Sequence, residues 1–462
     1  MSDLLRRLYH HLPAPARSAA ATLRGLYLRS WRYGAETERL VEQALEREHW
    51  SAAQWHGWQQ ERLAQVLHRA ATQVPYYRAL WSARRRRGDR RSWDVLEHWP
   101  ILEKEPLRRD PRAFVAQDCD VRQMWHANTS GTTGTPLHVW RSRSAMRALF
   151  ALALLRSRHW HGVSRRDRWA MLGGQLVTPV RSRRPPFWVW NAALRQLYMS
   201  SYHLAPDLIP HYLDALAQYR IVYLFGYPSS IYELAREVLR SGRKDLEMAV
   251  VLTSGEPLRD QRAVIAAAFH CPVRETYGAT EGVVAASECE AGGLHLWPEV
   301  GMVEFMEDAE LVCTGLLNPD SPLIRYRIGD RAQLPTNGAS CSCGRTLPWL
   351  PGIDGRSSDS LVTHDGRRVV WLNPVFYGLP IRLAQIIQET ADRLRVRYVP
   401  ADDFTTDTPQ QLVERLRSRM GPVEVVLEGV ADLPRGAGGK LRPVVSLLAT
   451  APSNGGAASH AV

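Results

Sequence analysis

From about residue 120 onward, short apolar runs alternate with helical segments, and this alternation constrains the fold more than any other feature. Residues 223–226 and 248–252 form two such runs, and turn residues follow each of them. Segments with helical periodicity come next, at 231–239 and 261–268. Buried strands alternating with helices are typical of α/β folds. We therefore predict an α/β core over residues 121–355.

The flanking regions have a different character. Residues 1–120 repeat apolar side chains at helical spacing, which predicts a helical N-terminal part of the large domain. After Gly355 a turn-rich passage leads into strand-like and helical runs, which predict a smaller α+β C-terminal domain over 356–450. The small and polar residues 451–462 are expected to be a disordered tail.

Charge and composition exclude several classes of protein. The net charge is +12, but lysine occurs only three times among 59 basic residues, so arginine on solvated faces is the simplest explanation and no specific nucleic-acid partner is expected. A basic amphipathic N-terminus around Leu8 could contact a membrane surface, although core packing is the favoured interpretation. No run of about 18–20 apolar residues occurs, and we expect a cytoplasmic location.

A segment rich in hydroxyl groups and glycine lies between two strand-like stretches. It consists of Thr129, Ser130, Gly131, Thr132, Thr133 and Gly134, followed by Thr135 and Pro136. Its glycines allow consecutive backbone N–H groups to aim at one point, and the hydroxyl donors suit an anion such as phosphate. It is not a Walker loop, because no Lys-Ser/Thr pair follows the second glycine. A plain hairpin turn is the alternative.

Two further segments carry carboxylates beside turns. Tyr277 and Gly278 can stack on a flat ring, and Glu281 can hold Mg²⁺ through oxygen, the ligand that this ion prefers. Asp330 is expected at a turn after a strand, where a carboxylate can accept both hydroxyls of a ribose. An ordinary strand end followed by a helix N-cap is the alternative for the first segment.

A glycine-rich segment near the C-terminus contains Lys440. Because this chain uses arginine at nearly every basic position, a lysine in this segment indicates a specific role for its ammonium group. A compact ammonium on a flexible stem can reach into a cleft and follow charge during a reaction. Chance placement is the alternative.

Three thiols and one imidazole form a candidate metal set: Cys289, His295, Cys341 and Cys343. A Cys₃His set suits structural, tetrahedral zinc. Such an ion would join the loop after the Tyr277 segment to the loop after Asp330. Incidental thiols beside a hydrogen-bonded histidine are the alternative.

Together and in this order, the motifs resemble those of the adenylate-forming superfamily of acyl-CoA synthetases. The branch is the phenylacetate–CoA ligase-like one, and within it the CapK group. The resemblance covers nearly the whole chain and includes Val74-Pro75-Tyr76-Tyr77 and Gly226-Tyr227-Pro228. It implies a large multi-sheet domain with a small, mobile α+β C-terminal lid domain, and zinc at matching positions in relatives.

The resemblance also implies roles for these residues. Residues 129–134 would wrap the β- and γ-phosphates of ATP. The adenine pocket would be formed by Gly255, Glu256, Tyr277 and Gly278. Thr280 would contact the α-phosphate, Glu281 would hold Mg²⁺, and Asp330 would bind the ribose with help from Arg356. Lys440 would reach the α-phosphate when the lid swings about a hinge near Asp359.

The implied activity is ATP-dependent activation of a small-molecule carboxylic acid to an acyl-adenylate, with release of pyrophosphate. Transfer to a thiol follows, with coenzyme A as the expected co-substrate. Alternatives are transfer to another acceptor in polysaccharide or secondary metabolism, and a nucleotide-binding scaffold without activity. The scaffold is considered because Thr135 and Leu137 stand where many relatives have a lysine; Arg141 or Arg143 could supply that cation. A dimer is one option for the oligomeric state.

Overall fold

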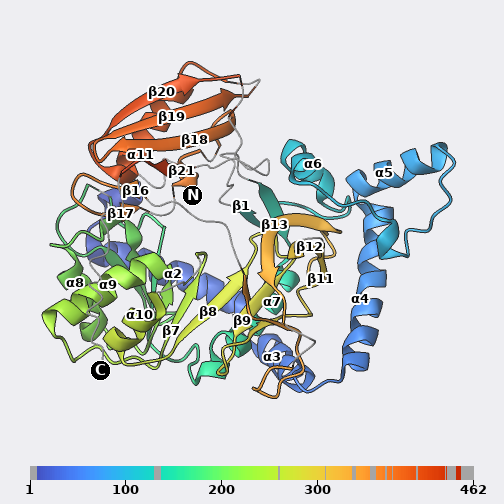
Figure 1. Ribbon diagram of the computed structural model, residues 1–462, viewed down its shortest axis with the longest axis horizontal. Helices are drawn as coiled ribbons and strands as arrows, with labels where there is room; N and C mark the ends of the chain where they lie inside the picture. Colours follow the sequence, from blue (N-terminus) through green and yellow to red (C-terminus); the bar gives the residue numbers. More distant parts are fainter. Residues whose placement is uncertain are drawn as a thin grey trace, which may run out of the picture. The chain divides into compact units, whose positions relative to one another are not determined.

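The computed structural model divides into two compact units, one ending at Ser358 and the other beginning at Asp359 (Figure 1). The structure describes residues 8–128, 137–179, 181–256, 258, 261–306, 309–335, 340–353, 361–369, 372–376, 378–401, 404–431, 433 and 444–448. Each unit contains both helices and sheets. The expected α/β class, with several sheets and a C-terminal domain, is confirmed.

The N-terminal part of the first unit is helical, as its periodicity predicts. Its helices are α2 (Ala14–Arg32), α3 (Ala35–Arg47), α4 (Ala52–Gln73), α5 (Pro75–Arg86) and α6 (Lys104–Arg109), with short 3₁₀ turns at Leu96–His98 and Pro111–Phe114. The Ser51 hydroxyl accepts a hydrogen bond from the Gln54 N–H and so begins α4 with a capping box. Pro75 ends α4 at Val74 and supplies the first residue of α5. Local sequence therefore fixes where these helices begin and end.

A nine-stranded sheet forms the centre of this unit (Figure 1). In sheet order its strands are β14 (Trp349–Leu350), β10 (Leu294–Leu296), β9 (Ala285–Glu288), β8 (Val273–Gly278), β7 (Val250–Ser254), β6 (Tyr223–Gly226), β3 (Trp169–Gly173), β5 (Gln196–Ser200) and β4 (Trp188–Asn191). The five strands from β8 to β5 in this order run parallel. Two of them, β6 and β7, are the apolar runs that the sequence pattern predicts as buried strands.

Helices cover the parallel strands on the side where the core is most apolar. These are α8 (Ile209–Gln218), α9 (Pro228–Ser241) and α10 (Gln261–Phe269). Tyr212, Leu234 and Ile265, one from each helix, are fully buried in one cluster with the strand residues Leu224 and Val251. The helix α7 (Arg143–Arg156) packs against α3 and buries Leu152 and Leu155. Further 3₁₀ turns lie at His159–His161 and Ser201–His203.

The first unit also has a four-stranded antiparallel sheet and a separate hairpin. The sheet is formed by β11 (Gly301–Phe305), β12 (Glu310–Gly315), β13 (Tyr326–Gln333) and β15 (Gly352–Ile353). The hairpin is formed by β1 (Trp125–Asn128) and β2 (His138–Arg141). These two strands flank residues 129–136, which lie outside the described part of the chain.

One expectation about local structure is wrong. Asp330 does not lie in a turn after a strand; it lies within β13. The pairing register between β12 and β13 shifts between Glu310 and Val312, and Gly329 has a φ of +82°. The Lys104 ammonium donates to the Ile328 carbonyl at 2.8 Å. Such a bulge re-aims a side chain without ending the strand, and here it sets the direction of Asp330.

The second unit is built on a four-stranded sheet and one long helix. The strands are β20 (Glu424–Gly429), β19 (Arg393–Pro400), β18 (Ile381–Thr390) and β21 (Val444–Ser446), with a small hairpin of β16 (Leu361–Val362) and β17 (Arg368–Val369). The helix α11 (Thr408–Met420) buries Leu412 and Leu416, and a 3₁₀ turn lies at Asn373–Phe376. Among the described residues, no helix combines the length and apolar character needed to cross a bilayer.

Candidate nucleotide site and cysteine–histidine cluster

The carboxyl ends of three neighbouring parallel strands bring together most of the described residues predicted to bind nucleotide. Tyr227 follows β6, Gly255 and Glu256 follow β7, and Gly278 ends β8. In open parallel sheets, ligands bind outside the carboxyl ends of the strands. The topology therefore places these residues at the edge of the sheet where binding sites form.

The turn after β7 needs glycine. Gly255 has a φ of +85°, a region that L side chains rarely adopt. A Cβ atom there would lie 3.1 Å from Cε1 of the Tyr227 ring. The backbone of Gly255 thus lies close to an aromatic ring that directly follows the neighbouring strand β6. The neighbouring Glu256 carboxylate accepts a hydrogen bond of 3.2 Å from the Ser229 N–H, a donor in the first turn of α9.

Tyr277 and Asp330 are in direct contact, although they come from different sheets. The Tyr277 hydroxyl donates to the Asp330 Oδ2 atom at 2.8 Å. Tyr277 is the next-to-last residue of β8, and Asp330 lies on the bulge of β13. Both side chains are half-buried. A flat ring and a carboxylate are therefore held side by side, as a bound nucleoside requires.

Glu281 lies next to a buried cation. Its Oε1 atom accepts a hydrogen bond of 2.9 Å from the Tyr326 hydroxyl. The Arg141 guanidinium is buried near it, and burial lowers the pKa of Arg141 while the Glu281 charge opposes that change. Gly282 has a φ of +75°, and a Cβ atom there would lie 3.1 Å from Arg141 Nε. This Nε atom has no hydrogen-bond partner among the described residues.

Other predicted residues lie elsewhere or outside the described part of the chain. Thr280 is described and exposed, one residue before Glu281. Arg143, the other candidate cation, donates instead to the Tyr27 hydroxyl at 3.3 Å. The remaining predicted residues fall outside the described residues: Thr129, Ser130, Gly131, Thr132, Thr133, Gly134, Arg356 and Lys440, with the hinge at Asp359 and the tail 451–462.

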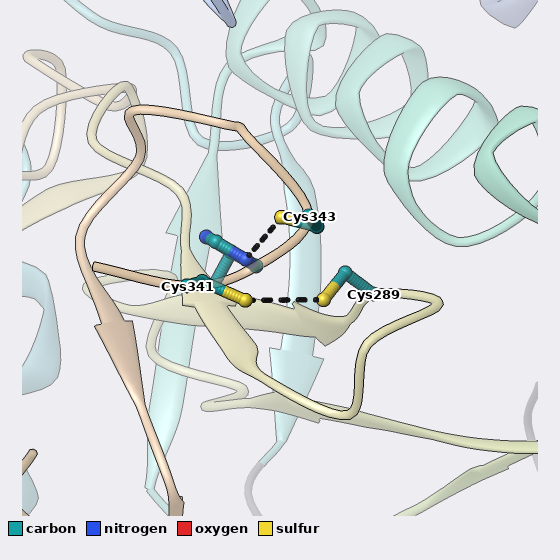
Figure 2. A group of neighbouring side chains, drawn as sticks. Cys289, Cys341 and Cys343 are labelled. Carbon is teal, nitrogen blue, oxygen red and sulfur yellow. Dashed lines mark hydrogen bonds between the residues drawn. The ribbon is translucent and has the colours of Figure 1, made fainter. Parts of the chain in front are cut away.

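The four metal candidates converge in the first unit (Figure 2). The ligand atoms of Cys289, His295, Cys341 and Cys343 all lie within 4.8 Å of one another. The Cys289 and Cys341 sulfurs are 3.6 Å apart, and the Cys343 sulfur lies 3.2 Å from His295 Nε2. Figure 2 shows the three labelled cysteines reaching toward a common centre from two loops, one that carries Cys289 and one that carries Cys341 and Cys343.

The surroundings of the cluster fit a tetrahedral cation. His295 Nδ1 pairs with the Leu347 carbonyl at 3.1 Å, which leaves Nε2 facing the sulfurs. A Cβ atom on Gly293 would lie 2.8 Å from the Cys341 sulfur, so only glycine leaves this space open. Burial raises the pKa of the Cys289 thiol to about 12, and a metal ion would have to replace that proton. Three thiolates and one imidazole are a closed zinc set.

A network of charges connects this cluster to the helices. Arg345, two residues after Cys343, contacts Glu290 at 2.8 Å and Glu48 at 3.5 Å. Glu48 also lies 3.5 Å from Arg156, whose guanidinium donates twice to the Glu299 carboxylate at 2.7 and 3.0 Å. Arg156, Glu48 and Glu299 are all buried, so removal of one partner would leave an uncompensated charge in the interior.

Sequence reasoning missed some residues of these sites. Tyr326, which holds Glu281, and Gly293, which leaves room for a sulfur, gave no signal of their own beyond lying close to the predicted motifs. For His203 and Tyr227 the sequence leaves two interpretations, a packed residue, which is favoured, or part of an acyl pocket. His203 is fully buried, bonded to Ser200 and Pro179 and stacked on Phe187, whereas Tyr227 lies against Gly255 at the candidate site.

Comparison with known proteins agrees with the expected resemblance. Residues 361–446 match the family model of the CapK C-terminal domain. Protein CapK of Staphylococcus aureus is 25% identical over 362 residues, covering 75% of this chain and 79% of that protein.

Solved structures of 2-hydroxyisobutyryl-CoA ligase share the fold. The structure of an open conformation with 2-HIB-AMP and CoA gives a TM-score of 0.54 at 20% identity, covering 86% of this chain and 93% of that one. The structure in the thioesterification state, with the same ligands, gives 0.54 at 21% identity, covering 87% and 91%. The chain therefore has the fold of adenylate-forming ligases, and its resemblance to that superfamily and to CapK is confirmed.

Proposed function

We propose that this protein activates a carboxylic acid with ATP, forming an acyl-adenylate and releasing pyrophosphate. The observation that carries the proposal is the hydrogen bond between Tyr277 and Asp330 at the carboxyl edge of the parallel strands. It places an aromatic ring suited to stacking beside a carboxylate, the group that accepts ribose hydroxyls in this proposal. The shared fold with adenylate-forming ligases supports the same function.

In this proposal the nucleoside lies against Tyr277, with Gly255 and Glu256 lining the base pocket and Gly278 allowing close approach. Asp330, aided by Arg356, accepts the ribose hydroxyls. Residues 129–134 surround the β- and γ-phosphates, and Thr280 contacts the α-phosphate. These assignments follow the sequence resemblance, and the geometry of the described residues is consistent with them.

Glu281 is the proposed magnesium ligand. A single carboxylate together with substrate phosphates is a common way to hold Mg²⁺, which otherwise keeps its waters. When bound, this ion supplies positive charge at the phosphates. Tyr326 holds the Glu281 carboxylate in place at 2.9 Å. Arg141, buried beside Gly282 and with no partner for its Nε among the described residues, is the proposed replacement for the lysine that many relatives carry after the phosphate loop.

In the proposed reaction the bonds form and break between the two substrates, and the protein contributes little covalent chemistry. The substrate carboxylate attacks the α-phosphorus and pyrophosphate leaves, so the rate depends on positioning and on stabilising the developing charge. Lys440 is assigned to the α-phosphate and the attacking carboxylate. We further propose transfer of the acyl group to a thiol, with coenzyme A as acceptor, because the ligases that share the fold were solved with an acyl-AMP and CoA.

Zinc is the proposed occupant of the Cys₃His cluster, in a structural role. Because three protein thiolates and one imidazole complete a tetrahedron, no position remains for substrate. The cluster would tie the loop that carries Cys341 and Cys343 to the β9–β10 hairpin, next to β8, the strand that carries Tyr277.

The test is pyrophosphate release from ATP in the presence of Mg²⁺ and a panel of carboxylic acids, with mass spectrometry of the products. We expect release with at least one acid, and a thioester when coenzyme A is added. Lys440→Ala should abolish release, whereas Lys244→Ala, an exposed lysine of the first unit, should leave it unchanged. ATP binding without pyrophosphate release for any acid would instead favour a nucleotide-binding scaffold.

A further inference from the structure

The helix α2 turns its polar side toward the protein and its apolar side toward solvent. Ser18, Thr22 and Gly25 share one face, at spacings of four and three residues. The Ser18 hydroxyl accepts a hydrogen bond of 3.2 Å from the Trp190 N–H, and the Thr22 hydroxyl one of 3.1 Å from the Ala192 N–H. These amides lie in and just after β4, the last strand of the nine-stranded sheet.

The rest of the inward face combines polar contacts with close packing, and Ala21 packs against a small apolar cluster that contains Val189 and Tyr198. Arg17 is buried and donates to the Val177 carbonyl at 2.9 Å and to the Thr178 hydroxyl. A Cβ atom on Gly25 would lie 2.1 Å from the Asn191 Oδ1 atom, so the helix lies directly against the strand. The helix is therefore fixed in this orientation by its polar side chains.

The outward face carries large apolar side chains in consequence. Leu23 is 68% exposed and Leu26 is 51% exposed. Leu8 and Leu12 precede the helix and are exposed, as is Tyr27. We call Leu23, Leu26 and Tyr27 the α2 ridge. A row of exposed apolar side chains along one short stretch marks an interaction surface.

The charge around the ridge identifies the kind of partner. The described residues from Leu8 to Ala35 include four arginines and no aspartate or glutamate, and one of the four, Arg17, is buried on the inward face. Arg24 and Arg29 are exposed on the helix. Arg143 adds a further guanidinium, which contacts the Tyr27 hydroxyl. A second copy of this chain would bring the same cationic segment against itself, which repulsion opposes. An anionic lipid surface matches both the apolar ridge and the surrounding arginines.

We propose that the α2 ridge docks this protein onto the surface of a membrane that contains anionic lipids. The helix lies in the plane of the interface, with Leu23 and Leu26 between the acyl chains and Arg24 and Arg29 at the headgroups. This inference does not depend on the proposed activity. Apolar insertion and headgroup attraction both contribute, so loss of either weakens binding.

The test is cosedimentation of the full chain with vesicles of phosphatidylcholine alone or mixed with phosphatidylglycerol. We expect binding to the anionic vesicles only, and weaker binding as salt is raised. The double variant Leu23→Ser and Leu26→Ser should bind about tenfold less, as should Arg24→Gln with Arg29→Gln. Leu239→Ser, an exposed leucine on α9, is the matched control and should bind as the parent does.

Folding and oligomeric state are measured on the same samples. Because Leu23 and Leu26 are exposed, their replacement should leave the circular dichroism spectrum and melting temperature unchanged. The proposal is overturned if the parent does not bind anionic vesicles, or if the leucine variant binds as tightly as the parent. It is also overturned if sedimentation velocity shows that the parent is a dimer and the leucine variant a monomer, while both bind vesicles equally.

Discussion

The Tyr277–Asp330 hydrogen bond gives the sharpest test of the nucleotide site. Tyr277→Phe keeps the aromatic ring for stacking and removes only the hydroxyl that holds Asp330 at 2.8 Å. Hydrogen bonds to charged groups contribute about 1.5–3 kcal/mol, and because both side chains are half-buried we expect the lower end, about 1.5 kcal/mol. Since about 1.4 kcal/mol corresponds to a factor of ten, AMP should bind about tenfold more weakly.

Isothermal titration calorimetry with AMP measures this effect without requiring the acid substrate. Tyr219→Phe is the matched control, because Tyr219 follows α8 near the opposite end of the parallel strands, and its variant should bind AMP as the parent does. In a double-mutant cycle with Asp330→Asn, the two changes should couple by about 1 kcal/mol. The reasoning is refuted if Tyr277→Phe binds AMP as tightly as the parent, or if the two changes are additive.

Three further predictions concern the metal cluster, the buried ion pair and acid stability. Cys289→Ser should remove bound zinc, measured by inductively coupled plasma mass spectrometry, and lower the melting temperature; equal zinc content in parent and variant would contradict the assignment. Glu299→Gln leaves the buried Arg156 with a weakened partner set and should lower the free energy of unfolding by about 3 kcal/mol in urea, with an unchanged m-value. Burial lowers the pKa of His161 to about 4, so the folded state binds fewer protons than the unfolded state between about pH 6.5 and 4. Stability should therefore fall on acidification through that window, by about 1–2 kcal/mol from this residue, and His161→Gln should flatten the profile; an unchanged slope would contradict it.

The sequence predicted those parts of the fold that local patterns determine. The apolar runs that became β6 and β7 are recognisable because strands of a parallel sheet are buried on both faces. The helices α4 and α5 are recognisable because Ser51 and Pro75 mark their beginnings. The parallel strands then bring their carboxyl ends together, so Gly255 and Tyr277 could be expected at one site.

What could not be predicted depends on pairing between distant segments. Asp330 was expected at a turn after a strand, where a carboxylate can accept both hydroxyls of a ribose. The shift in register with β12 keeps the chain in the strand instead, and no local pattern reveals it. Likewise, the leucines of α2 suggest a helix packed through its apolar side. Instead, N–H groups at the edge of the sheet, in and just after β4, donate hydrogen bonds to hydroxyls of α2. The hydroxyl side of the helix therefore faces the sheet.

Both edges of the nine-stranded sheet are protected against the addition of further strands. At one border, hydroxyl groups of α2 already accept two amide hydrogens of the β4 segment. At the other, β14 has only two residues and leaves little backbone for a further strand. Exposed strand borders are where sheets add foreign strands and aggregate. Removal of all residues up to and including Thr22 would therefore uncover the longer border, and the shortened protein would be prone to form fibrous or amorphous deposits.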